Sequence, residues 1–175
     1  MKNSSFRKIY REGLEQNALY GLILNESKDF LLIAREYDFY LDGYQIIRKS
    51  DITSSITNKS NKYVYKILKS EGKLKSLQIP EISLNTWQSI FKSLGKGEFI
   101  SVEDEEVGEF AIGPIIRVNK QSVVLRYFDG AGTWGNEEKI GYKNITSLQF
   151  KTNYINCHAK YIQPWQGVQR NGNNE

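Results

Sequence analysis

Short apolar runs separated by turn-forming residues dominate the first part of the chain. Leu19 to Leu24, Phe30 to Ala34 and Tyr44 to Arg48 have the length and the residue types of β-strands. Asn25-Glu26-Ser27 separates the first two runs, and a Leu-Asp-Gly turn signal at Leu41 to Gly43 precedes the third. This pattern predicts a mainly β protein.

The same pattern occurs a second time, which predicts an internal repeat. The stretch Leu19 to Leu68 aligns from end to end with Ile112 to Ile162, and the few length differences fall in turns, where hairpins tolerate them. The matched positions are Gly21 with Gly113, Ile23-Leu24 with Ile115-Ile116, Lys28 with Lys120, Leu31-Leu32-Ile33 with Val123-Val124-Leu125, Ile47 with Ile140, Asp51-Ile52-Thr53 with Asn144-Ile145-Thr146, and Tyr63-Val64 with Tyr154-Ile155. One β-rich unit is therefore expected to be built twice.

Each copy reads as four short strands joined by turns, and the last strand contains the matched Tyr63-Val64 or Tyr154-Ile155 pair. So few short strands do not form a stable flat sheet alone, whereas a small barrel buries one face and removes the exposed edges. We therefore predict two tandem small SH3-like or Sm-like β-barrels. The alternative is one larger sandwich that uses all the strands.

Apolar residues at a spacing of three and four predict one amphipathic helix, residues 84–94, between the two copies. Its apolar positions are Leu84, Trp87, Ile90, Phe91 and Leu94. Ser83 is the expected N-cap and Gly95 the expected C′ residue. We expect Trp87 and Phe91 to be core residues that seal the open end of a barrel or the seam between the barrels.

These elements divide the chain into four parts. Residues 1–75 form an N-terminal barrel repeat, 76–98 a connector with the helix, 99–165 a C-terminal barrel repeat and 166–175 a flexible tail. A short helix is expected before the first copy, with Phe6, Ile9, Tyr10 and Leu14 as its apolar residues. The corresponding place in the second copy, Phe99 to Val102, has the pattern of a strand.

The repeat resembles a tandem of Sm-like or SH3-like barrels of the kind found in small bacterial proteins. The residues that carry the resemblance are Gly21 with Ile23-Leu24 at the opening, the Leu-Asp-Gly-Tyr turn at Leu41 to Tyr44, and the Asp51-Ile52-Thr53 signature. It covers residues 19–68 and 112–162. The resemblance implies the tandem-barrel fold and carries no site residue across.

Composition narrows the functional classes only slightly. A net charge of +4 in 175 residues makes the chain mildly cationic. A single cysteine excludes an internal disulfide, and one cysteine with one histidine cannot form a Cys/His-type structural zinc site. The N-terminal residues lack the apolar core of a signal peptide, and no run is long enough to cross a bilayer, so we expect a cytoplasmic protein that does not bind membranes.

The sequence contains no recognisable catalytic constellation, so we expect a protein that is not an enzyme and that uses no cofactor or metal. His158 is expected on the polar face of the alternating run Tyr154 to Ile162, and Cys157 on its apolar face as a buried, inert thiol. The Gly-x-Gly loop at Asp129 to Gly135 has strands on both sides, which favours a hairpin turn over a phosphate cradle. The four consecutive carboxylates from Glu103 to Glu106 point alternately to opposite sides of an extended chain and predict a solvated loop.

Aromatic residues in two corresponding loops are the candidate partner-binding residues. Trp134 is expected to point outward from its loop, and the counterpart loop, Tyr37 to Gly43, carries Tyr37, Phe39 and Tyr40. Trp and Tyr provide a large contact area at a small entropy cost. The alternative is that both loops fold back to cap their own barrels. We predict a non-enzymatic interaction protein, of adaptor or immunity type, that recognises a protein partner.

A second set of residues points to RNA or single-stranded nucleic acid as the alternative partner. The candidates are Lys59, Lys62, Tyr63, Tyr65, Lys66 and Lys69, followed by Lys73 and Lys75. Lysines interleaved with tyrosines are typical of a weak nucleic-acid patch. The same lysines also suit a solvated edge strand that resists aggregation.

Overall fold

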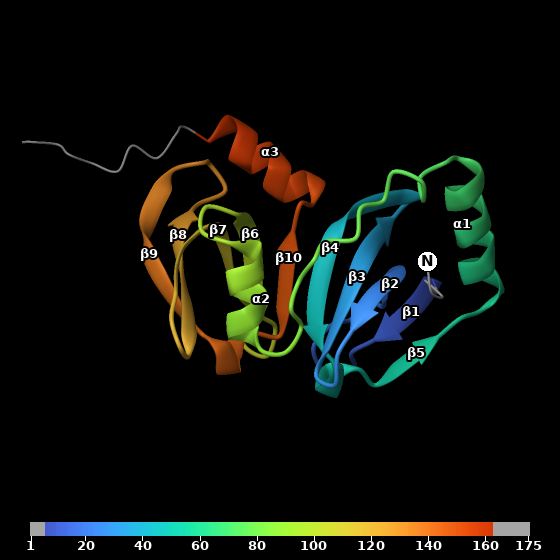
Figure 1. The fold of residues 1–175 in the computed structure, drawn as a ribbon, viewed down its shortest axis with the longest axis horizontal. Helices are drawn as coiled ribbons and strands as arrows, with labels where there is room; N and C mark the ends of the chain where they lie inside the picture. Colours follow the sequence, from blue (N-terminus) through green and yellow to red (C-terminus); the bar gives the residue numbers. More distant parts are fainter. Residues whose placement is uncertain (1–5, 163–175) are drawn as a thin grey trace, which may run out of the picture.

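The structure, a computed structural model, describes residues 6–162 and contains ten strands and three α-helices in that part of the chain (Figure 1). The strands are β1 (Phe6–Tyr10), β2 (Leu19–Glu26), β3 (Phe30–Tyr37), β4 (Tyr40–Arg48), β5 (Ser54–Ile56), β6 (Phe99–Asp104), β7 (Glu109–Val118), β8 (Ser122–Phe128), β9 (Trp134–Gly141) and β10 (Ser147–Phe150). The helices are α1 (Lys59–Ser70), α2 (Trp87–Leu94) and α3 (Asn153–Tyr161), with short 3₁₀ turns η1 (Lys49–Asp51) and η2 (Tyr142–Asn144). The predicted mainly β class is confirmed. The predicted tail, residues 166–175, lies outside the described residues.

All ten strands pair antiparallel in one open sheet with the order β5-β1-β2-β3-β4-β10-β6-β7-β8-β9. We call β1–β5 with α1 the N-terminal half and β6–β10 with α3 the C-terminal half. Each half has five strands, a 3₁₀ turn before the fifth strand and a helix after it, and the strand order is the same in both. No closed barrel is present among residues 6–162, and the sheet ends at β5 on one side and β9 on the other.

Positions matched in the sequence have nearly identical backbone geometry. Ile52 follows η1 with φ −82° and ψ 115°, and Ile145 follows η2 with φ −83° and ψ 114°. A Cβ atom on Gly21 would lie 2.3 Å from the carbonyl oxygen of Ala34, and one on Gly113 would lie 1.9 Å from that of Arg126. Both positions therefore require glycine for the same reason, a close approach to the neighbouring strand.

The threonine of the Asp-Ile-Thr signature also has the same role in both halves. The Thr53 hydroxyl donates to the carbonyl of Tyr10 (3.1 Å), and the Thr146 hydroxyl donates to the carbonyl of Glu103 (2.9 Å). Each threonine thus ties the start of the fifth strand to the end of the first strand of its half.

Helix α2 lies against β7 and β8 of the C-terminal half (Figure 1), and its apolar side also contacts the N-terminal half. The Trp87 ring meets Phe30 of β3 edge-on at 4.8 Å, and the Phe91 ring stacks on Tyr142 of η2 at 5.7 Å. The predicted bridging role of these two core aromatics is confirmed. The predicted start was wrong, because the N-cap is Thr86, whose side chain accepts from the backbone N–H of Ser89.

Three predicted elements were wrong. Phe6–Tyr10 is strand β1, the counterpart of β6, rather than a helix, because it pairs with β2 and β5. The last segment of each copy is a helix, α1 or α3, rather than a strand. Asn58 and Asn61 form a capping box that starts α1, and Thr152 caps α3.

The two halves meet where β4 pairs with β10, which we call the seam. Ile46 pairs with Leu148 and Tyr44 with Phe150, and the last two rings stack at 5.0 Å. Gln45 donates to the hydroxyl of Ser147 (2.7 Å) in the same strand pair. The seam therefore combines apolar packing with a buried polar contact.

Candidate partner-binding site

The β3–β4 hairpin carries three of the predicted binding residues at its tip. Tyr37 pairs with Tyr40, and a two-residue turn, Asp38-Phe39, joins them. Both turn residues have positive φ, 48° at Asp38 and 65° at Phe39. The exposed fractions are 73% for Tyr37, 41% for Phe39 and 62% for Tyr40, so all three aromatic side chains face solvent.

The turn predicted at Leu41 to Gly43 was misplaced. These residues lie inside β4, where the register between β3 and β4 shifts and Gly43 has a φ of +66°. A Cβ atom on Gly43 would lie 2.5 Å from the backbone of Lys151, so this glycine lets the strand pass close to the end of β10. The Asp-Gly pair therefore marks a bulge next to the seam.

Two hollows flank the aromatic tip. One has a volume of about 700 Å³ and includes Tyr37, Asp38, Tyr20 and Arg35 in its lining. The other has a volume of about 310 Å³ and is lined on one side by Tyr40. The hairpin thus stands as a ridge between two concave surfaces.

Polar contacts hold the ridge in place. The Glu36 carboxylate accepts the backbone N–H of Phe39 (2.7 Å), which fixes the turn. The Lys73 ammonium lies 4.2 Å from the centre of the Tyr40 ring, a cation–π distance. The tip is therefore exposed and also ordered by its neighbours.

Trp134, the fourth predicted binding residue, does not join this surface. It is half-buried in the C-terminal half, where its ring packs edge-on against Phe128 at 5.7 Å and near Phe99 at 6.5 Å. Residues of α3, among them Ile155 and Ile162, complete this cluster. The predicted outward orientation was wrong because α3 supplies an apolar surface that the ring covers.

The Gly-x-Gly loop is a hairpin connection, as predicted, between β8 and β9. The Asp129 carboxylate accepts the backbone N–H groups of Ala131 and Thr133, both at 2.9 Å, and Gly132 has a φ of +75°. A phosphate cradle needs such N–H groups to point at the ligand. In this loop, the Asp129 carboxylate already accepts these N–H groups, so they do not point at a ligand.

His158 and Cys157 lie on helix α3 and not on a strand. Cys157 is exposed, so the predicted buried thiol was wrong. His158 is half-buried, with its ring 5.1 Å from Phe128 and 4.7 Å from Tyr154. These contacts make His158 part of the aromatic packing under α3.

The predicted nucleic-acid-binding residues lie on α1 rather than on an edge strand. Helical spacing places Lys59, Lys62, Lys66 and Lys69 along one exposed face, with Tyr63 beside them at 63% exposure. Tyr65 is half-buried and packs in the cluster between α1 and the sheet. Lys73 and Lys75 follow in the turn after the helix.

The acidic run from Glu103 to Glu106 is not the solvated loop that its composition predicted. Only Glu106 is exposed, while Glu103 and Glu105 extend to the same side of the chain and lie at the seam. The Glu105 side chain is 10% exposed and pairs with the Arg11 guanidinium, whose side chain is completely buried. Composition could not reveal this pairing, because the two residues are far apart in sequence.

Neither the structure nor the comparisons assign a chemistry to the chain. Within residues 6–162, no three His, Cys, Asp or Glu side chains gather as metal ligands would. Among the described helices, none has the length and apolarity needed to span a membrane. No known protein family, curated protein or solved structure matches the chain.

Proposed function

We propose that the protein binds a protein partner through the tip of the β3–β4 hairpin. The observation that carries this proposal is the bulky Phe39 at a turn position with a φ of +65°, between the exposed Tyr37 and Tyr40. Two-residue turns of this kind favour Gly or Asn, and a bulky residue there costs about 1–3 kcal/mol. Folding gains little from an exposed Phe at this place, whereas an aromatic contact residue would offset the strain.

The surroundings of the tip support recognition of a protein. Exposed Tyr and Phe side chains are enriched at protein interfaces, where a few of them supply most of the binding energy. The hollows on either side of the ridge can receive side chains of the partner. A non-enzymatic role of adaptor or immunity type is consistent with this surface.

We also propose that the two halves are SH3-like or Sm-like units, with a connector over residues 76–98. The strand order with the fifth strand beside the first, and the 3₁₀ turn before the fifth strand, support this proposal in both halves. The matched backbone angles at Ile52 and Ile145 support a common ancestry of the two units.

Site-specific photo-crosslinking in the native host tests the binding proposal. A photoreactive phenylalanine analogue at Tyr37 is expected to capture one protein, and the same analogue at Tyr161, which is 75% exposed on α3, serves as the matched control. The captured protein is then purified, and its affinity is expected to fall at least tenfold with Phe39→Ala or Tyr40→Ala. Capture from both positions alike, or an unchanged affinity, contradicts the proposal.

The exposed lysine face of α1 favours a second candidate, a protein that binds single-stranded nucleic acid. Four lysines on one helix face, with Tyr63 available for stacking, form an arrangement that tracks a phosphate backbone. Binding of a fluorescent single-stranded RNA should fall steeply with added salt and be lost in Lys62→Glu with Lys66→Glu. Absence of binding at low salt removes this candidate.

A further inference from the structure

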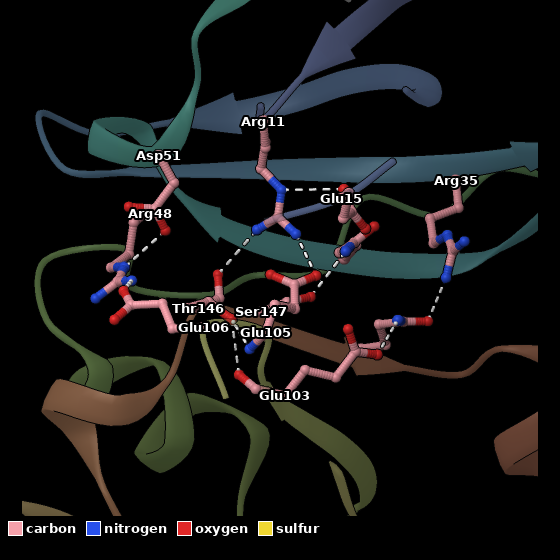
Figure 2. Close-up of polar contacts among 12 residues, drawn as sticks. Arg11, Glu15, Arg35, Arg48, Asp51, Glu103, Glu105, Glu106, Thr146 and Ser147 are labelled. Carbon is pink, nitrogen blue, oxygen red and sulfur yellow. Dashed lines mark hydrogen bonds and ion pairs between the residues drawn. The ribbon is translucent and has the colours of Figure 1, made fainter. Parts of the chain in front are cut away.

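A network of charged groups joins the two halves beside the strand pairing of the seam (Figure 2). Arg11, the residue directly after β1, pairs with Glu15 at 3.1 Å and with Glu105, and it donates to the carbonyl of Thr146. Arg35 of β3 donates to the side-chain oxygen of Gln149 in β10. Gln149 in turn donates to the Glu103 carboxyl at 2.8 Å.

The network is electrically neutral only if it holds a proton. Its cations are two guanidiniums, Arg11 and Arg35, and its acids are three carboxyls, Glu15, Glu103 and Glu105. A carboxylate without a compensating cation in such a shielded place is costly, so the usual outcome is that one acid stays protonated.

The hydrogen bonds show where the proton fits. One oxygen of Glu105 is paired with Arg11, while its other oxygen, Oε2, is buried without a hydrogen-bond partner in the described structure. Glu105 lies beside both the Glu103 and the Glu15 carboxyls, and ionised carboxylates provide no donor to one another. Glu15 already accepts from the Arg11 guanidinium at 3.1 Å, whereas Glu103 is linked to the Arg35 guanidinium through Gln149. A proton on Glu103 supplies that donor and completes a chain from Arg35 through Gln149, Glu103 and Glu105 to Arg11.

We propose that Glu103 is a carboxylic acid in the folded protein and that its proton, donated to Glu105, fastens the two halves together at the seam. The groups that connect to it come from both halves, because Arg11 and Arg35 belong to the N-terminal half and Glu103, Glu105 and Gln149 to the C-terminal half. Loss of the proton places two facing carboxylates at the seam and weakens it. The stability of the seam therefore depends on the protonation of Glu103.

The titration of Glu103 supports this arrangement. Burial, the neighbouring Glu105 carboxyl and the charge of Glu15 raise the pKa of Glu103 to about 7, and Arg35 opposes them. The other residues around Glu103 are not ionisable: β10 presents Ser147 opposite it and Gln149 diagonally, and β7 presents Phe110.

The sign of the pH effect follows from the direction of this shift. The pKa in the closed seam is above the ordinary value of 4.5, so the closed state binds the proton more tightly than the opened state. The contribution of Glu103 to seam stability is complete below pH 4.5 and is lost as the pH rises through 7. Well above pH 7 it does not change further, because the group is then ionised in both states.

Titration of the wild-type protein by NMR gives the direct test. The side-chain carboxyl carbon of Glu103 is expected to titrate with a midpoint near 7, assigned by its absence in Glu103→Gln. A midpoint at or below 4.5 overturns the proposal. This measurement needs only the wild-type protein if the variant does not fold, because the assignment can come from backbone-linked spectra.

Hydrogen exchange tests whether the proton on Glu103 stabilises the seam. In the wild-type protein, protection of the β10 amides, corrected for intrinsic exchange, is expected to fall between pH 4.5 and 7.5. This fall is expected to exceed the one in Glu103→Gln by tens of fold. Glutamine keeps a donor toward Glu105 and an acceptor for Gln149, so this variant should stay closed at both pH values. Glu106→Gln, at an exposed carboxylate that pairs with Arg48 at 3.2 Å, is the matched control and should retain the wild-type pH dependence. Equal pH dependence in wild type and Glu103→Gln overturns the proposal.

Discussion

The β3–β4 and β8–β9 hairpins occupy the same place in the two halves, and they use their aromatic residues in opposite ways. In the N-terminal half, Tyr37, Phe39 and Tyr40 face solvent around a strained two-residue turn. In the C-terminal half, a longer loop with glycine at its positive-φ position lets Trp134 pack on Phe128. One hairpin therefore exposes its aromatic residues, while the other adds its tryptophan to the core.

A second contrast separates the seam from the outer edges of the sheet. In the alignment of the two halves, Lys139 of β9 is the counterpart of Ile46 in β4. Ser55 of β5 is the counterpart of Leu148 in β10. Ile46 and Leu148 at the seam are completely buried and apolar, whereas Lys139 and Ser55 at the outer edges are exposed and polar. Polar and charged residues on edge strands prevent further pairing.

The largest mutational effect on stability is expected from the comparison between the seam and the outer edges. Leu148→Ser gives the seam the residue found at the outer edge, and it is expected to lower the free energy of unfolding by about 3 kcal/mol through a cavity and a buried hydroxyl. Urea unfolding measures the effect. Ser55→Ala is the control and should change stability by less than about 0.5 kcal/mol. Equal effects at the two positions would show that the seam is not a core.

The hairpin contrast should give the next largest effect. Trp134→Ala is expected to cost about 2 kcal/mol of stability, because the ring loses its contacts with Phe99 and Phe128. Tyr37→Ala should cost less than about 0.5 kcal/mol while reducing partner capture. Thermal unfolding of the two variants tests this, and a larger loss for Tyr37→Ala would reverse the assignment of roles.

Substitutions at the positive-φ positions of the two turns, Gly132 and Phe39, should affect stability in opposite ways. Gly132→Ala should lower stability by about 1 kcal/mol, because a side chain at a φ of +75° is strained. Phe39→Gly should instead leave stability unchanged or raise it by up to about 1 kcal/mol, while partner affinity falls. Denaturant midpoints measure both variants. Strong destabilisation by Phe39→Gly would mean that the aromatic tip serves folding.

The smallest expected effect on stability comes from the outer edges. Ser55→Leu with Lys139→Ile should change the free energy of unfolding by less than about 0.5 kcal/mol, since both positions are exposed. The substitutions give the outer edges apolar residues like those of the seam, so concentration-dependent association is expected. Sedimentation measures this association, with wild type as the control, and a monomeric variant would show that polar residues at these positions are not what protects the edges.

Local sequence patterns located β2, β3 and β4 and the matched positions from Gly21 and Gly113 to Thr53 and Thr146. Gly21 and Gly113 aligned because both meet a neighbouring carbonyl, and Ile52 and Ile145 aligned because both follow the same 3₁₀ turn. These constraints act within a few residues of each other or across adjacent strands. A single sequence therefore contains them.

Features that depend on distant packing were not predictable in the same way. The lysines and tyrosines of α1 alternate enough to imitate a strand, although Asn58 and Asn61 offered a capping signal for a helix. The burial of Trp134 depends on α3, so the wrong assignment of that segment led to the wrong orientation. The guanidinium that pairs with Glu105 belongs to Arg11 in the other half of the molecule, and no local pattern indicates this pairing.

The position of β10 also bears on how the chain is made in the cell. Among the ten strands β10 is the last to be synthesised, yet it pairs between β4 and β6 in the interior of the sheet. Until the ribosome has released it, β4 presents Ile46 and Tyr44 along an unpaired edge, which favours contacts with other nascent chains. Delayed release or truncation before Ser147 would therefore be expected to cause aggregation, even though nearly all of the sheet has already been made.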